Sequence, residues 1–382
     1  MKVAMISEFP LDFEKIQGGI SAVVYYLSRE LSKYPDLTLE IISCQKEVNK
    51  EITKYLNRVP VHFIPSSKLP YLISNFTVRK WRIKDIIHKI NPDLLHLQGQ
   101  SYHSYPALYG KYPTIMSVHG IMYEEVKYLK KSPFKWIRSY LYKMIEKTCL
   151  KKANYIVASN EYAYDKIKHL IKGKKYYLLN NPIDPSFFTI DRIPEKNRIL
   201  FVGRIEPRKG LEYLVEAIDI LRSKIEIKLF VIGVPQRTDY YNKLLYLVKK
   251  LHLTEFIIFK GLIDQDKLME EYSICQLLVL PSIEETSPMV IQQAMAAGVP
   301  VIATKAGGIP YLIKNRETGI LVETKDSLAL ANAILGALNN PNACDFFINK
   351  AKNVALEKFN VVRIAAQIKE IYNQIMSKNS HQ

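Results

Sequence analysis

Short apolar runs alternate with amphipathic segments along this chain, and the alternation forms two successive series. In the first series, apolar runs predict strands at residues 3–7, 39–43, 61–64, 94–97, 114–118, 155–158 and 176–179, and helical patterns lie at 20–33, 78–90, 134–151 and 161–171. A chain that alternates strand and helix in this way forms a parallel sheet with helices on both faces. The first series therefore predicts a doubly wound α/β domain.

A second series of the same kind follows a turn-rich break at residues 180–186, and we place the linker at about 183–197. Strands are expected at 199–202, 227–232, 256–259, 277–280, 299–303 and 320–322, and helices at 211–223, 239–251, 265–273, 288–297, 327–338, 342–357 and 361–378. We expect two Rossmann-like domains that face each other across a cleft. The first would comprise residues 1–187 with the final helix, and the second residues 188–358.

The stretch at residues 281–298 joins two apolar runs of the second series. Ser287 and Pro288 suit the first residues of a helix, and Gly298 suits its end. The start of such a helix presents unpaired N–H groups and a partial positive charge beyond the carboxyl end of the preceding strand, where open α/β sheets bind ligands. A phosphate fits this position.

Two carboxylates, Glu284 and Glu285, lie beside this expected phosphate site. Carboxylates are not phosphate ligands, so we expect them to accept hydrogen bonds from hydroxyl groups. Phosphate and hydroxyl groups together suggest a nucleotide sugar.

A second loop, at residues 203–210, follows the first strand of the second series and contains two cations, Arg204 next to Gly203 and Lys209 next to Gly210. Two fixed cations around a tight turn at a strand end suit the neutralisation of a diphosphate leaving group. The alternative is a solvated basic loop, and Arg208 fits that description. The same sheet edge carries the acidic loop, which favours the diphosphate interpretation.

The first domain contributes two weaker motifs. Gly18 and Gly19 join the first strand to the first helix, where paired glycines let the backbone approach a phosphate, although a plain flexible turn is equally consistent with the pair. His119 with Gly120 ends the strand at 114–118. A lone histidine is more often structural, but at a strand end it can bind a substrate hydroxyl or a backbone carbonyl, or act as an acid or base.

Metal and disulfide chemistry are not expected. Asp264 and Asp266 resemble a metal-binding pair, but Asp264 stands where a helix begins and suits an N-cap. The cysteines are far apart in mostly apolar or helical contexts, which predicts buried thiols at Cys44, Cys149, Cys275 and Cys344.

The net charge of +17 is concentrated in the first half, where residues 1–190 hold 29 Lys and Arg against 16 Asp and Glu. This asymmetry suggests an acidic partner such as a membrane surface, although a lysine-rich composition can also serve solubility. No membrane-spanning run and no signal peptide are expected, so we predict a cytoplasmic protein. A nucleic-acid partner is not expected, because no recognition motif accompanies the charge.

Much of the basic charge lies in residues 127–152, which contain nine Lys or Arg residues and one acid, Glu146. Aromatic residues are interleaved with them at Phe134, Trp136, Tyr140 and Tyr142. Such a segment can lie on an anionic bilayer. It can equally be an ordinary helix that packs an apolar stripe on the sheet, and the two interpretations are compatible.

The second series resembles the retaining glycosyltransferases of family 4, which have the GT-B fold. The matching segments lie in family order at residues 202–210, 281–285, 294–304, 307–308 and 317–322. The first series matches more loosely, through Gly18-Gly19, His119-Gly120 and 181–184.

The resemblance implies a role for each matching residue. Arg204 and Lys209 would hold the donor diphosphate, Glu285 would bind hydroxyls of the donor sugar, and His119 would lie near the reacting sugar. Donor contacts would also come from Gly18, Gly19, Gly203, Thr286, Ser287, Pro288, Met289, Val290 and Gln293. Such enzymes generally need no metal, so no cofactor is expected beyond the nucleotide sugar.

Gln293 departs from the family pattern, which has a second glutamate that accepts hydrogen bonds from the ribose hydroxyls. A glutamine has one carbonyl oxygen for this purpose, so nucleotide binding is expected to differ. The leading hypothesis is a retaining transferase that moves a sugar from a nucleoside diphosphate sugar to a glycan or lipid-linked acceptor, in surface polysaccharide or glycolipid synthesis. The rivals are a GT-B epimerase or phosphorylase and, from a different class, a catalytically weak nucleotide-sugar-binding subunit of a glycan synthase complex.

Overall fold

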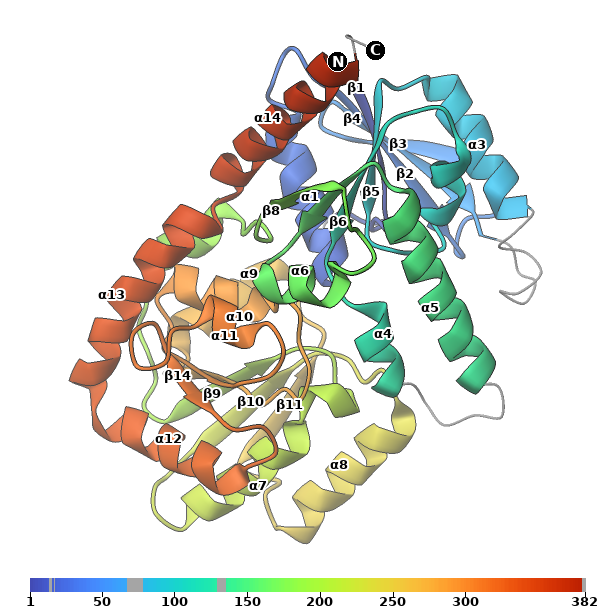
Figure 1. The fold of residues 1–382 in the computed structure, drawn as a ribbon. Helices are drawn as coiled ribbons and strands as arrows, with labels where there is room; N and C mark the ends of the chain where they lie inside the picture. Colours follow the sequence, from blue (N-terminus) through green and yellow to red (C-terminus); the bar gives the residue numbers. More distant parts are fainter. Residues whose placement is uncertain (14–15, 17, 67–77, 129–134, 380–382) are drawn as a thin grey trace. The chain divides into compact units, whose positions relative to one another are not determined.

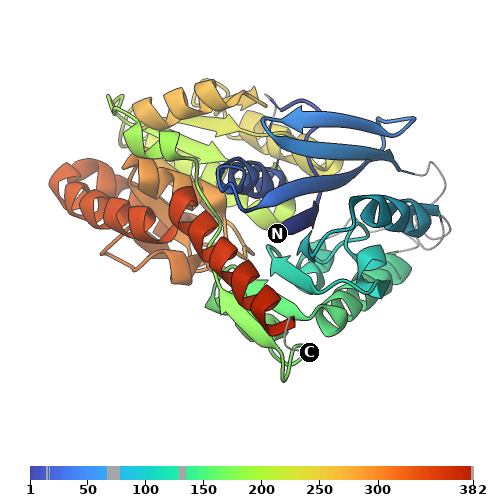
Figure 2. The same ribbon diagram turned by 90° about the horizontal axis from the view of Figure 1, so that it is seen from above.

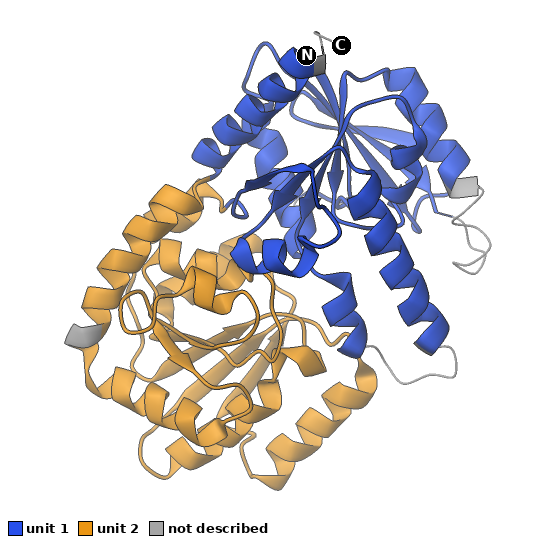
Figure 3. Cartoon of the chain, in the orientation of Figure 1, with its two compact units in different colours: residues 1–182, 361–382 blue, residues 183–360 orange. Residues whose placement is uncertain are grey.

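The computed structural model of the chain describes residues 1–382 except 14–15, 17, 67–77, 129–134 and 380–382. The chain divides into two compact units, which Figure 3 shows in different colours. Unit 1 comprises Met1–Pro182 and Val361–Gln382, and unit 2 comprises Ile183–Asn360. The boundary at residue 182 lies shortly before the predicted one at 187.

Unit 1 is built on an eight-stranded sheet with the order β3-β4-β2-β1-β5-β6-β7-β8 (Figure 1). Its strands are β1 (Lys2–Ile6), β2 (Thr38–Gln45), β3 (Ile52–Leu56), β4 (Val59–Pro65), β5 (Leu94–Gln98), β6 (Thr114–Val118), β7 (Tyr155–Ala158) and β8 (Lys175–Leu178). All neighbouring pairs are parallel except β3 and β4.

Helices cover both faces of this sheet, as the alternation predicts. They are α1 (Gly19–Leu31), α3 (Val78–Ile90), α4 (Met122–Glu125), α5 (Lys135–Lys152), α6 (Glu161–Ile167) and α14 (Val361–Asn379). Apolar residues of α1 and α14 share one buried cluster with the sheet, and α14 runs beside α1 (Figure 2). Apolar residues of α3, α5 and α6 form the cluster on the opposite face.

The edge strand β3 was not predicted. Its apolar residues are interrupted by Thr53 and Lys54 and give no apolar run, and the strand pairs antiparallel with β4 through a short turn at Asn57. Asn57 has a positive φ of 54°, which asparagine tolerates better than most residues. The sheet is therefore mixed at this edge. Polar and charged side chains are common on exposed edge strands, where they discourage pairing with other chains.

Unit 2 is a six-stranded, entirely parallel sheet with the order β11-β10-β9-β12-β13-β14. Its strands are β9 (Arg198–Val202), β10 (Lys228–Ile232), β11 (Ile257–Gly261), β12 (Leu277–Leu280), β13 (Val301–Thr304) and β14 (Ile320–Val322). Its helices are α7 (Leu211–Arg222), α8 (Thr238–Lys250), α9 (Gln265–Ile274), α10 (Met289–Ala297), α11 (Ile309–Leu312), α12 (Ser327–Asn339) and α13 (Pro341–Lys358). Helix α7 packs against α8 and α12, and α10 packs against α9 and α13.

Both sheets contain a topological switch point, where the chain changes the direction in which it adds strands. In unit 1 the switch lies between β1 and β5, because β2 was added on one side of β1 and β5 on the other. In unit 2 it lies between β9 and β12. Ligands of open α/β sheets bind beyond the carboxyl ends of the strands at such a point. The prediction of two Rossmann-like α/β domains is confirmed, and the four cysteines are buried free thiols as expected.

Candidate functional site at the switch point of unit 2

The two loops that the sequence singles out both leave strands at the switch point of unit 2. Residues 203–210 follow β9, and residues 281–288 follow β12. The loops are joined by a backbone hydrogen bond from Ile283 N to Arg208 O of 2.7 Å. The sheet topology therefore brings together the basic and the acidic loop, as expected for carboxyl ends of neighbouring parallel strands.

Two glycines allow the close approach of these segments. A Cβ atom on Gly210, which has a φ of 61°, would lie 2.3 Å from the carbonyl oxygen of Pro281. One on Gly307, which has a φ of 50°, would lie 2.0 Å from the carbonyl oxygen of Glu285. Any larger residue would force the backbone apart, so glycine at these positions is a condition of the site's geometry.

A buried group of charges lies where the loops meet. The side chain of Lys209 donates a hydrogen bond to one oxygen of Glu285, and Nη1 of Arg208 lies 3.4 Å from the other oxygen. Ser282 Oγ also donates to Glu285, over 2.9 Å. Glu285 is 5% exposed and Lys209 is 8% exposed, so both charges are held inside the protein by each other and by their neighbours.

The pKa values of this pair reflect burial and mutual attraction. Burial by itself would raise the pKa of Glu285, but the charges of Lys209 and Arg208 outweigh it and hold that pKa below the usual value. Burial lowers the pKa of Lys209, against the opposing attraction of Glu285. Glu285 is therefore an ionised hydrogen-bond acceptor, and Lys209 is a cation with little water around it. Such a cation interacts more strongly with an anion than a solvated lysine does.

Helix α10 begins beside this group, one residue after the predicted start. Pro288 is its N-cap residue, and Thr286, Ser287, Pro288 and Met289 are buried, while Val290 is half-buried. The first N–H groups of a helix have no partner within the helix and favour an anion in front of them. The helix ends at Gly298, which takes the left-handed conformation that the sequence suggested.

The two arginines of the basic loop differ in their surroundings. Arg204 is exposed next to the half-buried Gly203, whereas Arg208 is bonded to Glu206 over 2.8 Å and to Glu285. The interpretation of Arg208 as a solvated side chain is therefore wrong, and a role of Arg204 toward a diphosphate stays a prediction. The link of Arg208 to Glu285 spans 77 positions in the sequence, so only the sheet topology reveals it.

Gln293 lies inside unit 2, on α10. It is buried, and its carbonyl oxygen accepts a hydrogen bond from the hydroxyl of Tyr272 over 3.2 Å. Part of the acceptor capacity of this amide oxygen is therefore used by a neighbouring helix, α9.

His119 lies at the end of β6 in unit 1, as predicted. Its ring nitrogens face two side-chain amides, with Nδ1 3.1 Å from Asn181 Oδ1 and Nε2 2.7 Å from Gln98 Oε1. Burial lowers the pKa of His119 to about 4, so the ring is neutral at pH 7. The structure holds this ring with protein amides on both sides, and a role toward a substrate stays a prediction.

Gly18 and Gly19 stand at the start of α1, and Gly18 has a φ of 87°, which favours glycine. The glycine pair thus presents the first N–H groups of α1 at the switch point of unit 1. Contact with a donor phosphate also stays a prediction.

Asp264 caps α9 as predicted, because its side chain accepts a hydrogen bond from Lys267 N over 2.8 Å. In the part of the chain that the structure describes, no three His, Cys, Asp or Glu side chains gather into a group that could hold a metal ion.

Two family models match the chain and together span most of it. The model described as glycosyl transferases group 1 matches residues 184–354, and the model described as glycosyltransferase family 4 matches residues 17–187. The two parallel α/β units and these matches define a GT-B type protein. The chain belongs to the group 1, family 4 glycosyltransferases.

Individual proteins of this kind are similar to the chain. The lipopolysaccharide 1,2-N-acetylglucosaminetransferase of Salmonella typhimurium is 32% identical over 199 residues, which are 50% of this chain and 51% of that enzyme. The chain spans about half the length of the curated relatives it matches.

Solved structures are similar over the full length. The sucrose-phosphate synthase of Thermosynechococcus elongatus has a TM-score of 0.84 at 22% identity and covers 99% of both chains. HepE of Anabaena in complex with UDP-glucose has a TM-score of 0.75 at 17% identity, over 98% of this chain and 100% of that one. At these identities the likeness shows the GT-B fold.

Proposed function

We propose that this protein is a retaining glycosyltransferase that moves a sugar from a nucleoside diphosphate sugar to a hydroxyl of a glycan or lipid-linked acceptor. The observation that carries the proposal is the buried contact of Lys209 and Glu285 beside the start of α10 at the switch point of unit 2. At this position cationic groups and the first N–H groups of a helix can bind phosphate, and a carboxylate beside them can bind hydroxyl groups.

Each charged group has a proposed task. Arg204 and Lys209 neutralise the diphosphate as the bond to the sugar breaks, which lowers the barrier to its departure. Glu285 accepts hydrogen bonds from hydroxyls of the donor sugar and so fixes its orientation. Retention of the anomeric configuration follows if the acceptor attacks from the face that the diphosphate leaves, with the departing phosphate taking the acceptor's proton.

These side chains supply the positive charge that a metal ion would otherwise provide to the leaving group, so we propose that transfer needs no metal. Transfer that survives an excess of EDTA would agree with this. Complete loss with EDTA and recovery with Mg²⁺ or Mn²⁺ would contradict it.

The donor can be identified by thermal stability. A ligand that binds the native state raises the melting temperature by mass action, so UDP-, GDP- and ADP-sugars can be compared directly. HepE binds UDP-glucose, which makes UDP-sugars the first choice. We expect one nucleotide class to stabilise the protein and the Lys209→Met variant to lose the effect. If none of the three classes stabilises the wild type, the proposal is wrong.

We further propose that unit 1 contacts an anionic membrane through α5. Trp136 and Tyr140 of this helix are 71% and 66% exposed, and Arg138, Lys143, Lys147, Lys151 and Lys152 are exposed as well. Ile145, Cys149 and Leu150 of the same helix are buried in the core. The helix therefore packs apolar residues on the sheet and exposes aromatic and basic side chains that suit an anionic bilayer. Lys130, Lys131 and Phe134 of the same segment lie outside the described residues.

Membrane contact would place the protein at the inner face of the cell membrane, where a lipid-linked acceptor for polysaccharide or glycolipid synthesis would be found. In the described part of the chain no helix is long and apolar enough to cross a bilayer. Flotation with vesicles of phosphatidylglycerol and phosphatidylcholine tests the contact. We expect binding that salt weakens, and weaker binding by Trp136→Ser. Equal flotation with pure phosphatidylcholine would contradict the proposal.

One observation favours a second candidate, a nucleotide-sugar-binding subunit with little turnover of its own. The amide oxygen of Gln293 is engaged by Tyr272, so the ribose would be held less firmly than by a free carboxylate. Nucleotide binding without transfer to any acceptor extract would support this candidate.

A further inference from the structure

A cavity lies on the face of the unit 1 sheet that α3 and α5 cover (Figure 1). It has a volume of about 270 Å³ and lies between α3, the helical turn at Tyr105–Tyr109 and the loop that leads into β6. Pockets for drug-sized ligands have volumes of about 300–1,000 Å³. The cavity is therefore too small for a whole nucleotide sugar and suits a smaller ligand.

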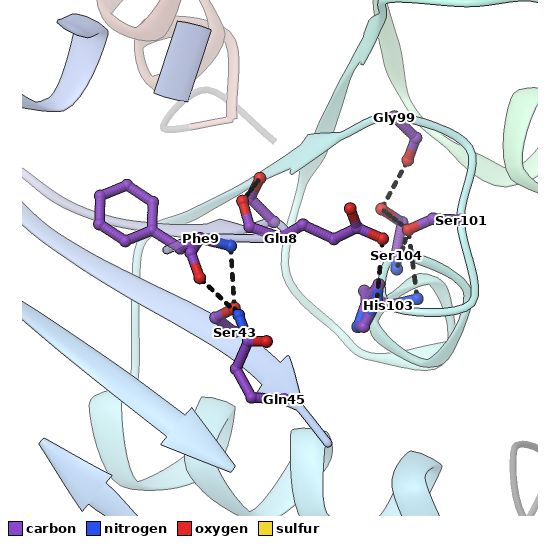
Figure 4. A network of polar contacts seen from close by, with 9 residues as sticks. Glu8, Phe9, Ser43, Gln45, Gly99, Ser101, His103 and Ser104 are labelled. Atoms are coloured by element: carbon purple, nitrogen blue, oxygen red, sulfur yellow. Dashed lines mark hydrogen bonds and ion pairs between the residues drawn. The ribbon is translucent and has the colours of Figure 1, made fainter. Parts of the chain in front are cut away.

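The cavity lies at the amino ends of the strands of unit 1. Leu95, which lines it, is the second residue of β5, and residues 110–112 precede β6. His119 and the contact of Glu8 with His103 (Figure 4) lie beyond the carboxyl ends of the strands. A strand rises about 3.3 Å per residue, so about 15 Å separate the two edges of the sheet. The cavity is therefore separate from the edge where the topology predicts a substrate.

Three basic side chains of the described residues line the cavity. Lys84 and His88 are four positions apart on α3 and share one face of the helix, and Lys111 belongs to the loop before β6. None of the described lining residues is acidic, and these three side chains form no ion pair in the described part of the chain. The acid of α3, Asp85, is paired with Lys89 over 2.8 Å. The positive charge at the cavity is therefore not neutralised by carboxylates.

Tyr109 brings two more cations to the cavity that it lines. The ammonium groups of Lys80 and Lys152 lie over its ring, 4.7 and 4.1 Å from the centroid. The hydroxyl of Tyr109 donates a hydrogen bond to Tyr105 Oη over 2.8 Å, which fixes the ring. Cation–π contacts of this kind hold both ammonium groups near the cavity.

Basic residues near the end of a helix often serve only to stabilise that helix. This explanation suits His88 and Lys89, which lie in the last turn of α3, but not Lys84 in the middle of the helix. The end of α3 also has another donor, because Lys2 Nζ donates to Ile90 O over 3.0 Å. Helix stabilisation therefore does not account for the charge at the cavity.

The rest of the lining is apolar or aromatic. Ile87, Leu95 and Ala107 belong to the buried core of this face, and the rings of Tyr109 and Tyr112 are more exposed. The hydroxyl of Tyr112 donates to Asn91 Oδ1 over 3.0 Å, so this ring is fixed too. A bare inorganic anion would leave the aromatic surface without a partner. A ligand that carries both an anionic group and an organic body fits the whole cavity better.

We propose that this cavity binds an organic phosphate. The phosphate group contacts Lys84, His88 and Lys111, and the organic body lies against the rings of Tyr109 and Tyr112. Lysine binds phosphate as a compact charge with three donors, and the rings offer apolar area that is already ordered. The phosphate of a lipid headgroup and a soluble phosphate ester share this chemistry. The site goes beyond the proposed function, because it requires neither the donor nor the acceptor of the transfer.

Titration calorimetry of the full chain at low salt tests the site, because exposed charges are little screened there. The probes are glycerol 3-phosphate, dihexanoyl phosphatidic acid below its micelle concentration, and inorganic phosphate. With an excess of UDP present, we expect the wild type to bind at least one organic phosphate more tightly than inorganic phosphate. Lys84→Met should weaken that binding about tenfold, because a charge-assisted hydrogen bond is lost.

Lys89→Met is the matched control, since Lys89 lies on the same helix but is paired with Asp85. It should bind as the wild type does, and so should Trp136→Ser, which alters the exposed face of α5. Gly110→Leu narrows the cavity and keeps every charge. Gly110 is exposed, and a Cβ there would lie 3.6 Å from Ala107 O, an ordinary contact. This variant should fold and lose the organic phosphate.

Tighter binding of the phosphatidic acid than of glycerol 3-phosphate would identify a lipid phosphate as the ligand. Equal or weaker binding of the lipid would identify a soluble ester, and both results support the site. Wild-type affinity in Lys84→Met or Gly110→Leu, displacement by UDP, or no preference over inorganic phosphate would overturn it. Failure to bind any nucleotide would overturn the proposed function and leave this result unaffected.

Discussion

Lys209 and Glu285 are paired inside unit 2, although 76 positions separate them in the sequence. The pair exists because β9 and β12 are neighbours in the sheet and because Gly210 lets their loops touch. Both partners are nearly inaccessible to water, so removing Glu285 would leave Lys209 as a buried, uncompensated charge.

Glu285→Gln is therefore expected to reduce both stability and transfer. The buried ammonium of Lys209 loses its main partner, which costs about 3 kcal/mol of unfolding free energy. Urea unfolding measures the loss, and Glu284→Gln in the same loop is the control. Equal stability of the two variants would show that the pair contributes little.

The double variant Lys209→Met with Glu285→Leu separates folding from function. Replacing both charges with apolar groups of similar size restores most of the lost stability. Sugar transfer should remain absent, because the variant lacks the ammonium group that binds the diphosphate and the carboxylate that binds the sugar hydroxyls. A double variant that is stable and active would remove the pair from the mechanism.

Arg204 and Arg208 are expected to differ in what their removal changes. Arg204→Ala should leave the melting temperature unchanged and weaken UDP binding, since the side chain is exposed. Arg208→Ala should lower the melting temperature, because it breaks the bonds to Glu206 and Glu285. Titration calorimetry with UDP and thermal unfolding of both variants measure these two effects. A lower melting temperature in Arg204→Ala with an unchanged one in Arg208→Ala would contradict the prediction.

Gln293→Glu should tighten nucleotide binding. A carboxylate offers a second oxygen to the ribose while the first still accepts from Tyr272 Oη, and a charge-assisted hydrogen bond contributes about 1.5–3 kcal/mol. We expect UDP affinity to rise about tenfold in titration calorimetry. Unchanged affinity would place the ribose away from this residue.

Acid should destabilise unit 1 through His96. Burial, with the nearby His119, lowers the pKa of His96 to about 3, so the folded state holds it neutral while the unfolded chain protonates it near pH 6.5. The stability from this group is present above pH 6.5 and is lost as the pH falls toward 3, by about 1 kcal/mol per pH unit. His96→Leu should reduce the slope measured by urea unfolding between pH 7 and 4 without abolishing it, because burial lowers the pKa of His119 to about 4 as well. The exposed His169→Leu should leave the slope unchanged, and a wild-type slope in His96→Leu would exclude this origin.

The sequence predicted α10 and its neighbouring strands almost to the residue, because Leu277–Leu280 is a continuous apolar run and Gly298 ends the helix. It did not predict β3, because the three central residues of this strand are exposed and the hydrophobic positions therefore do not alternate with polar ones. Helices and strands could be predicted where the burial of their side chains gives the sequence a regular hydrophobic pattern.

Long-range contacts were harder to predict. In the sequence Arg208 fits a solvated basic loop, because the proximity of Glu285 depends on the order of strands in the sheet. The contact of His103 with Glu8 likewise depends on β1 and β5 being neighbours, and nothing near either residue in the sequence indicates it. Both contacts are formed by loops from strands that are neighbours only in the folded sheet.

We propose that the site around Lys209 and Glu285 breaks the bond between sugar and diphosphate. This is tested by measuring release of nucleoside diphosphate from UDP-, GDP- and ADP-sugars, with an acceptor extract, by the wild type and by the double variant Lys209→Met with Glu285→Leu. We expect release from one nucleotide class by the wild type, with the sugar configuration retained in the product, and none by the folded double variant. Equal release by both proteins would contradict it.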